Sequence, residues 1–197
     1  MIVTVASFKG GVGKTTTAVH LAAYLQQRSP TLLVDGDPNR SATGWTQRGA
    51  LPFKVIDERL LARHARDYEH IVIDTQARPD PADLRTLVEG CDLLVLPSTP
   101  DVLALDALRQ TIEALEGIGA KSYRVLLTIV PPRPSRDGED ARAMLKGSGV
   151  PLFKSDITRR VAFQKAALAG VPVSEAKDPR AASAWQEYER IGKEIVK

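Results

Sequence analysis

Short apolar segments alternate with longer amphipathic ones along most of the chain. Several of the short segments are β-branched or leucine-rich and apolar on both faces, which is typical of strands covered on both sides by helices. They are Ile2–Ala6, Thr31–Asp35, His70–Asp74, Asp92–Pro97 and Arg124–Val130. Weaker strand candidates are Phe53–Asp57 and Pro151–Ile157.

The longer segments have apolar residues at helical spacing or clear helix end signals. They are residues 13–28, 80–90, 101–119 and 178–197. In the second of these, Asp80 is the expected N-cap, Pro81 occupies the first helical position and Gly90 ends the helix. The proline-rich stretch 131–140 predicts a long exposed loop.

Alternating strands and helices predict an α/β fold, a doubly wound and mostly parallel sheet flanked by helices. The chain has 197 residues, of which 43% are hydrophobic, so we expect a single domain over residues 1–197. In such folds ligands bind at the carboxyl ends of the strands. The candidate functional residues should therefore follow strands.

The composition limits the kinds of functional site that the chain could contain. The net charge of +3 is compatible with a polyanionic partner without demanding one. Cys91 is the one cysteine, which excludes an intrachain disulfide and a cysteine-rich metal site and fits a reducing cytoplasm. The three histidines have no partner at metal spacing. The chain opens on a strand pattern without signal-peptide features, and no apolar run approaches the roughly 20 residues of a membrane span.

A glycine-rich loop lies between the first predicted strand and helix. The segment Gly10–Thr16 fits the phosphate-binding pattern Gly-x-x-x-x-Gly-Lys-[Ser/Thr], except that Phe8 occupies its first position. Glycines allow backbone N–H groups to close around phosphate oxygens, Lys14 would reach the β- and γ-phosphates, and the Thr15 hydroxyl would coordinate Mg²⁺. Residues expected to bind nucleotide are Lys9, Gly10, Gly11, Val12, Gly13, Lys14, Thr15 and Thr16.

Three aspartates follow predicted strands. Asp35 and Asp37 end one strand, and Asp74 ends another. Asp35 and Asp74 are expected to hold magnesium through water, and Asp37 to orient the attacking water. The polar run from Pro38 to Thr43 is expected to be a mobile switch loop that senses the γ-phosphate.

These motifs together resemble those of the ParA/MinD ATPases. Lys9 with the glycine loop is similar to the family's deviant Walker A box, and "VDGDPN" is similar to "VDxDPQ" with Asn39 in place of glutamine. "IVIDTQARPD" resembles the Walker B segment, although the usual Pro-Pro is displaced. Residues 156–175 resemble "IPxRxxxxEAxxxGxPV". The short chain is most similar to the compact ParA proteins of the ParF type and the carboxysome-positioning McdA type.

The resemblance implies how this chain would act. In the family, the lysine at the position of Lys9 crosses a dimer interface and contacts the nucleotide of the other subunit. The implied catalytic residues are Lys9, Lys14 and Asp37, and the implied cofactors are ATP and Mg²⁺. An ATP-sandwich homodimer would bind nucleoid DNA without sequence preference and position a cargo such as a plasmid or a protein compartment. Hydrolysis would be slow and stimulated by a cargo-bound ParB-like, ParG-like or McdB-like adaptor.

Basic residues near the end of the chain would on their own indicate a solvated face, but in a family that binds DNA without sequence preference they become candidates for phosphate contacts. They are Lys154, Arg159, Arg160 and Lys165. By resemblance, adenine should contact the loops after Thr128 and around residues 151–156. The expected location is the cytoplasm, on the nucleoid.

Two alternatives remain open. A membrane-associated relative of MinD type would need an amphipathic tail beyond the last helix, and the chain stops at "KEIVK", so we expect no membrane partner. A metabolic ATP-dependent enzyme of the same fold would have no need for Lys9 in a second subunit. A related iron–sulfur reductase is excluded because it needs two cysteine ligands per subunit.

Overall fold

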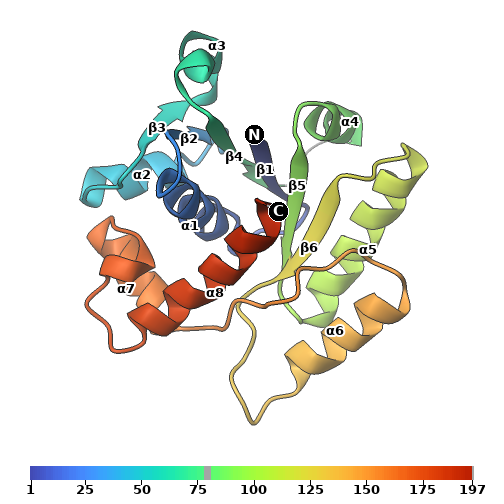
Figure 1. The fold of residues 1–197 in the computed structure, drawn as a ribbon. Helices are drawn as coiled ribbons and strands as arrows, with labels where there is room; N and C mark the ends of the chain where they lie inside the picture. The colour runs from blue at the N-terminus through green and yellow to red at the C-terminus, as the bar shows by residue number, and fades with distance from the viewer. Residues whose placement is uncertain (78–80, 197) are drawn as a thin grey trace.

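The computed structural model describes residues 1–77 and 81–196. In this part of the chain, strands form one six-stranded sheet in the order β3-β2-β4-β1-β5-β6 (Figure 1), and all of its neighbouring strands are parallel. The strands are β1 (Ile2–Ser7), β2 (Thr31–Asp35), β3 (Lys54–Asp57), β4 (His70–Ala77), β5 (Leu93–Ser98) and β6 (Tyr123–Leu127). The predicted fold class is confirmed.

The described α-helices lie on both faces of this sheet (Figure 1). One face is covered by α1 (Lys14–Gln26), α2 (Ser41–Arg48), α7 (Val161–Ala169) and α8 (Ala181–Ile195). The other is covered by α3 (Leu61–His64), α4 (Pro81–Glu89), α5 (Val102–Gly117) and α6 (Asp137–Gly147). Short 3₁₀ turns occupy Glu58–Leu60, Ala65–Asp67 and Val173–Glu175.

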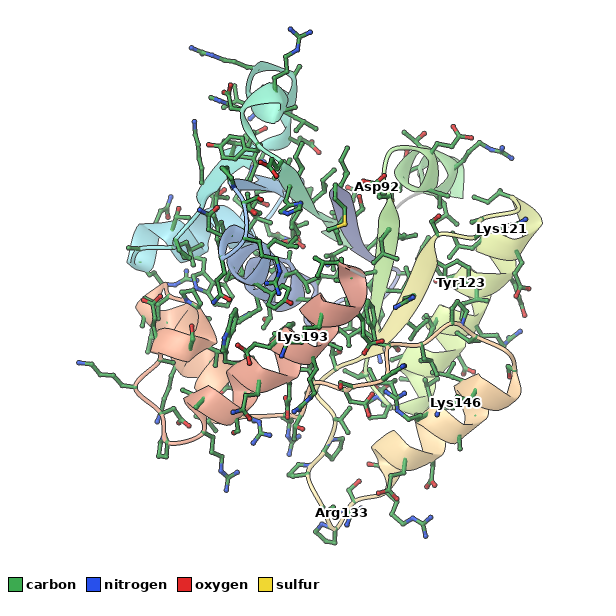
Figure 2. The ribbon with its side chains drawn as sticks, in the orientation of Figure 1. Asp92, Lys121, Tyr123, Arg133, Lys146 and Lys193 are labelled. Carbon is green, nitrogen blue, oxygen red and sulfur yellow. The ribbon has the colours of Figure 1, made fainter. Side chains whose placement is uncertain are left out.

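The two cores follow from the alternation of side chains along each strand. Val95 packs in the core under α1 and α8, whereas Leu94 and Leu96 on the same strand pack in the core under α5 and α6. Charged side chains such as Arg133 and Lys146 point away from the sheet (Figure 2). Among the described helices, none is long and apolar enough to cross a membrane.

Helices α1 and α8 approach each other closely. A Cβ added at Gly192 of α8 would lie 2.1 Å from Cδ1 of Tyr24 on α1, and the Tyr24 ring is fully buried. Such a distance is well below van der Waals contact, so only glycine permits this packing. The last helix is thereby seated directly on the helix that begins at the phosphate-binding loop.

One strand prediction is wrong. Residues 151–157 run beside β6 but form only isolated bridges with it. Side chains occupy some of the backbone groups that a regular ladder would use. Phe153 N–H bonds to Val125, but the Phe153 carbonyl then accepts from Arg142 and the Lys154 N–H donates to the Glu194 carboxylate. Pairing with β6 resumes only at Ile157.

Other boundaries also differ from those predicted. Strand β6 ends at Leu127 rather than Val130, and Ile129 has a left-handed φ of 53°, which an extended strand does not tolerate. The predicted loop 131–140 is shorter, because α6 begins at Asp137. The predicted mobile loop also ends early, since α2 begins at Ser41. The expected N-cap Asp80 lies outside the described residues.

Candidate nucleotide-binding site

The glycine-rich loop connects β1 to α1 at the carboxyl edge of the sheet. Gly11 and Gly13 have φ angles of 79° and 82°, a left-handed conformation that favours glycine. Gly13 is the N-cap of α1, so its missing side chain leaves the first helical N–H groups without a side-chain acceptor. The loop therefore directs backbone donors and the positive end of the helix dipole at one point, as an anion site requires.

Lys14 supplies a cation at the same point. Its side chain is only 7% exposed, and it forms no salt bridge with any residue of the described chain. A buried ammonium that no carboxylate contacts directly is costly unless a bound anion completes its environment. A cavity of about 450 Å³ opens beside it, lined by Lys14, Thr15, Asp37 and Asn39 among others. The volume and the cation fit a polyphosphate.

Asp74 gives the test of whether the site suits a divalent cation. The residue is fully buried, and neither carboxylate oxygen has a hydrogen-bond partner among the described residues. Burial raises the pKa of Asp74 to about 7, the Asp35 and Asp37 carboxylates act in the same direction, and the nearby Thr15 and Lys14 oppose them. An orphaned carboxylate beside a threonine hydroxyl fits a hydrated Mg²⁺ that phosphates also hold.

A Mg²⁺ ion at this position would not need all of its ligands from the protein. In residues 1–77 and 81–196 there is no group of three or more His, Cys, Asp or Glu side chains that could hold a metal ion. Mg²⁺ usually keeps several waters and takes one or two protein ligands plus phosphates. Thr15 and Asp74 would therefore suit such a site at this end of the sheet, and their contact with Mg²⁺ stays a prediction.

Asp35 is placed next to Asp74 by strand register, but its oxygens are already occupied. The two residues are Cα partners in the β2–β4 ladder. The Asp35 Oδ2 atom accepts hydrogen bonds from the N–H and the hydroxyl of Thr43, at 2.8 and 2.6 Å, and Oδ1 accepts from the Asp37 N–H at 3.3 Å. These contacts make Asp35 an anchor for the start of α2. A contact of Asp35 with metal-bound water stays a prediction.

Asp37 faces the cavity from the segment between β2 and α2. Its Oδ1 atom accepts from the backbone N–H and the side-chain amide of Asn39, at 2.9 and 3.0 Å. Arg40 holds the next turn, since its guanidinium donates to the Asp35 carbonyl at 2.8 Å and pairs with Asp57 at 2.7 Å. Arg40 has a left-handed φ of 52°, which is uncommon for a residue with a side chain. Strain at this point is typical of a segment that changes conformation with its ligand.

A second cavity of about 260 Å³ adjoins the first and shares Gly13, Thr16 and Ile129 with it. Its other walls are mainly the segment 157–160 and the side chains of α7. A purine ring could enter this space while its phosphates remain on the loop. The sequence pointed to the loop after Thr128, which does line this cavity, and to residues 151–156, which are not among its lining residues.

Glu187 of α8 fixes one wall of this second cavity. It is almost completely buried, and its carboxylate accepts from the Thr158 N–H at 3.0 Å, the Thr158 hydroxyl at 2.9 Å and the Arg160 guanidinium at 2.7 Å. Sequence reasoning missed this residue. The available signal was a glutamate on the apolar side of the last helix, next to Tyr188.

His20 connects α1 to the segment between α7 and α8. The imidazole is fully buried and stacks on Tyr188, with ring centroids 4.7 Å apart. Its Nε2 accepts from the Val173 N–H at 3.0 Å, so Nδ1 carries the proton and donates to the Thr16 carbonyl at 2.6 Å. Burial lowers the pKa of His20 to about 4, opposed by the Thr16 carbonyl. The neutral imidazole is a structural support under the loop.

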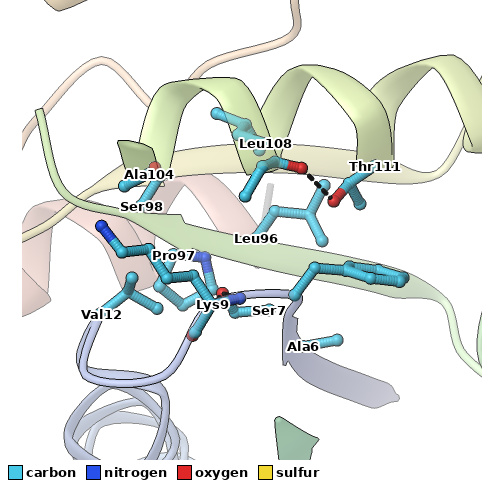
Figure 3. A pocket seen from close by; sticks show the side chains of 12 residues that line it. Ala6, Ser7, Lys9, Val12, Leu96, Pro97, Ser98, Ala104, Leu108 and Thr111 are labelled. Carbon is cyan, nitrogen blue, oxygen red and sulfur yellow. Dashed lines mark hydrogen bonds between the residues drawn. The ribbon is translucent and has the colours of Figure 1, made fainter. Parts of the chain in front are cut away.

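Lys9 points away from the chain's own phosphate cavity. It is not among the residues that line that cavity, and its Nζ atom lies 2.7 Å from Oδ1 of Asp101, at the start of α5. Figure 3 shows Lys9 beside Ser98 and Ala104, where β5 leads into α5. The structure therefore separates the two lysines of the loop, with Lys14 at the cavity and Lys9 on the outer side.

The four candidate DNA contacts differ in their surroundings. Lys154 and Arg159 are exposed and form no salt bridge within the described residues. Arg160 is partly buried in its ion pair with Glu187, and Lys165 is paired with Asp178 at 2.8 Å. The first two are thus free to meet phosphates, and the other two would exchange a partner.

Comparisons with known proteins show the family and the fold of the chain. Residues 3–173 match the model of the family described as "CbiA: CobQ/CobB/MinD/ParA nucleotide binding domain". The chain is 39% identical over 201 residues to maintenance of carboxysome distribution protein A of Gloeobacter kilaueensis, covering 98% of this chain and 93% of that protein.

Solved structures show the same fold. A plasmid partition protein from Borrelia burgdorferi B31 bound to AMPPNP superposes with a TM-score of 0.74 and 20% identity, covering 99% of this chain and 98% of that one. The septum site-determining protein MinD from Pyrococcus horikoshii, complexed with Mg-ADP, gives 0.73 and 18%, covering 100% and 96%. With the phosphate loop, the aspartates and the parallel sheet all in place, the chain belongs to the CobQ/CobB/MinD/ParA nucleotide-binding family, as its resemblance to the ParA/MinD ATPases predicts.

Proposed function

We propose that this protein is a ParA-type ATPase that forms an ATP-dependent homodimer, binds DNA without sequence preference and positions a cargo inside the cell. The observation that carries the proposal is the different placement of the Lys14 and Lys9 side chains. Lys14 is buried at the phosphate cavity without a direct salt bridge in the described chain, whereas Lys9 is held on the outside of the loop. A lysine that does not line its own chain's phosphate cavity is a candidate to serve a second subunit.

Each residue then has a distinct task in hydrolysis. The loop N–H groups and Lys14 bind and orient the β- and γ-phosphates, and Lys9 of the facing subunit offsets the repulsion between two nucleotides. Asp37 would orient the attacking water from the edge of the cavity. Mg²⁺, held by Thr15 and through water by Asp74, would neutralise charge on the phosphates. Loss of the γ-phosphate would weaken the dimer.

The names of two relatives support a role in positioning a cargo. The 39% identical relative is named for carboxysome distribution, and another, 29% identical over 82% of this chain, is protein ParA of Rhizobium radiobacter. We infer a cytoplasmic, nucleoid-bound protein that acts with a cargo-bound adaptor of ParB, ParG or McdB type. Lys154 and Arg159 are the proposed first contacts with DNA phosphates, and Arg160 and Lys165 would join them.

The test is retention of DNA by the protein with ATP, with ADP and without nucleotide. We expect retention with ATP alone, and a decline as salt rises, because non-specific binding is driven by counterion release. Lys14→Ala should bind no nucleotide and retain no DNA. Equal DNA binding in all three nucleotide conditions would contradict the proposal. An affinity that differs between DNA fragments of different base sequence would also contradict it.

A further inference from the structure

The free chain holds Lys9 in a contact that dimerisation must break. The Lys9 ammonium lies 2.7 Å from the Asp101 carboxylate, 92 residues away in sequence. The two side chains are 31% and 52% exposed. This is a surface ion pair, whose stabilisation is small and easily exchanged for a stronger anion.

Asp101 is itself fixed in place. It is the N-cap of α5, where Oδ1 accepts from the Ala104 N–H at 3.0 Å, and Oδ2 accepts from the Thr99 hydroxyl. Burial works against its charge, but the hydrogen bonds from Lys9, Thr99 and Ala104 outweigh it and lower the pKa of Asp101 to about 2. The carboxylate therefore stays ionised throughout the physiological range and always competes for Lys9.

The surface around this pair is suited to a partner. Val102 and Leu103 follow Asp101 directly and are 73% and 72% exposed. Exposed apolar side chains beside a charged pair are typical of a surface that another protein covers. Lys9 is thus held next to an exposed apolar surface that a second copy of the chain could cover.

We propose that Asp101 is a latch that holds Lys9 in the single subunit and sets the threshold for nucleotide-dependent dimerisation. The inference rests on the proposed function, in which Lys9 serves the nucleotide of a second copy of this chain. The multiply charged phosphates of that nucleotide attract Lys9 more strongly than one exposed carboxylate does. The latch weakens dimerisation by the same factor with either nucleotide, and a nucleotide with fewer phosphates is less able to overcome that cost.

The test compares dimer dissociation constants at saturating AMPPNP, measured by sedimentation velocity over a range of protein concentrations. Asp101→Asn removes the charge and keeps the helix cap, because asparagine is an equally good N-cap. Asp106→Asn is the matched control, since Asp106 is also an exposed aspartate of α5 and has no ion pair in the described chain. A second variant, Asp101→Ser, removes the charge and again retains a capping side chain.

Loss of one exposed ion pair changes an equilibrium constant by up to about five-fold. Each dimer requires two Lys9–Asp101 pairs to break, so removing the Asp101 charge should lower the dimer dissociation constant by up to ~25-fold. We expect this tightening for Asp101→Asn and Asp101→Ser, and a change below about two-fold for Asp106→Asn. If the Asp101 variants dimerise like the wild type or more weakly, the latch is refuted although the proposed function stands. If the wild type stays monomeric with AMPPNP, the proposed function itself fails, and the latch fails with it.

Discussion

The buried His20 makes the stability of the protein depend on pH in a predictable window. Its imidazole is neutral in the folded chain, because Nε2 accepts from Val173 and burial lowers the pKa of His20 to about 4. In the unfolded chain the pKa returns to the model-peptide value of about 6.5. Between these values the unfolded state binds a proton that the folded state refuses, so acid favours unfolding.

The sign and the size follow from linkage. The stabilisation by neutral His20 is complete above about pH 7 and is lost as the pH falls from 6.5 towards 4. The loss is about 2 kcal/mol by pH 5 and ~3 kcal/mol by pH 4. The rings of Trp45, Phe163 and Tyr188 surround the imidazole, and burial raises the pKa of Tyr188, so its phenol stays neutral here.

Urea unfolding followed by circular dichroism at pH 7.5 and pH 5.0 measures this effect. Carboxylates elsewhere also titrate, so the informative quantity is the difference between wild type and His20→Gln. We expect the free energy of unfolding of the wild type to fall by about 2 kcal/mol more than that of the variant between the two pH values. Equal pH dependence of the two proteins would refute the assignment of His20 as a neutral buried support.

Three further substitutions test the packing and the site. Gly192→Ala should lower the free energy of unfolding by about 1–3 kcal/mol, because its Cβ would meet the Tyr24 ring at 2.1 Å; an unchanged melting curve would contradict this close approach. Asp37→Ala should leave fluorescent ATP-analogue binding intact and slow phosphate release by about 10²-fold or more, and wild-type turnover would remove Asp37 from the mechanism. Thr43→Val should cost about 1–2 kcal/mol in urea unfolding, since a buried Asp35 oxygen loses a donor at 2.6 Å; no loss would show that the anchor is unimportant.

Local patterns in the sequence predicted the features that depend on a few neighbouring residues. The phosphate-binding loop could be recognised because its glycines, Lys14 and Thr15 are adjacent and lie between a strand and a helix. The strands of the central sheet were recognisable because they are apolar on both faces. Residues 151–157 looked similar, but contacts from Arg142 on the preceding helix and from Glu194 on the last helix interrupt their pairing.

Helices α2, α6 and α7 were not predicted, for local reasons. The start of α6 is the pair Asp137-Gly138, which is typical of a turn, although the acidic first turn was a usable signal for a helix N-terminus. The start of α2 is fixed by Asp35 and Thr43, which no local pattern reveals. Helix α7 lies within residues 156–175. This segment resembles a family motif, and that resemblance carries no prediction of its secondary structure.

The contacts that organise the site mostly join distant residues. Lys9 meets Asp101 across 92 positions, and Thr158 meets Glu187 across 29. No single-sequence pattern links such pairs, because they form only when the sheet brings their elements together. The motif therefore identified the candidate functional residues. The fold shows which of them already have side-chain partners and which do not.

The central claim is that Lys9 acts on the nucleotide of a second subunit. Light scattering at saturating ATP should give the dimer mass for the wild type and for Lys121→Ala, a control at another exposed lysine. Lys9→Ala should give the monomer mass while binding a fluorescent ATP analogue within about three-fold of the wild-type affinity, since exposed charges contribute little in cis. An ATP-dependent dimer of Lys9→Ala with wild-type stability would contradict the account.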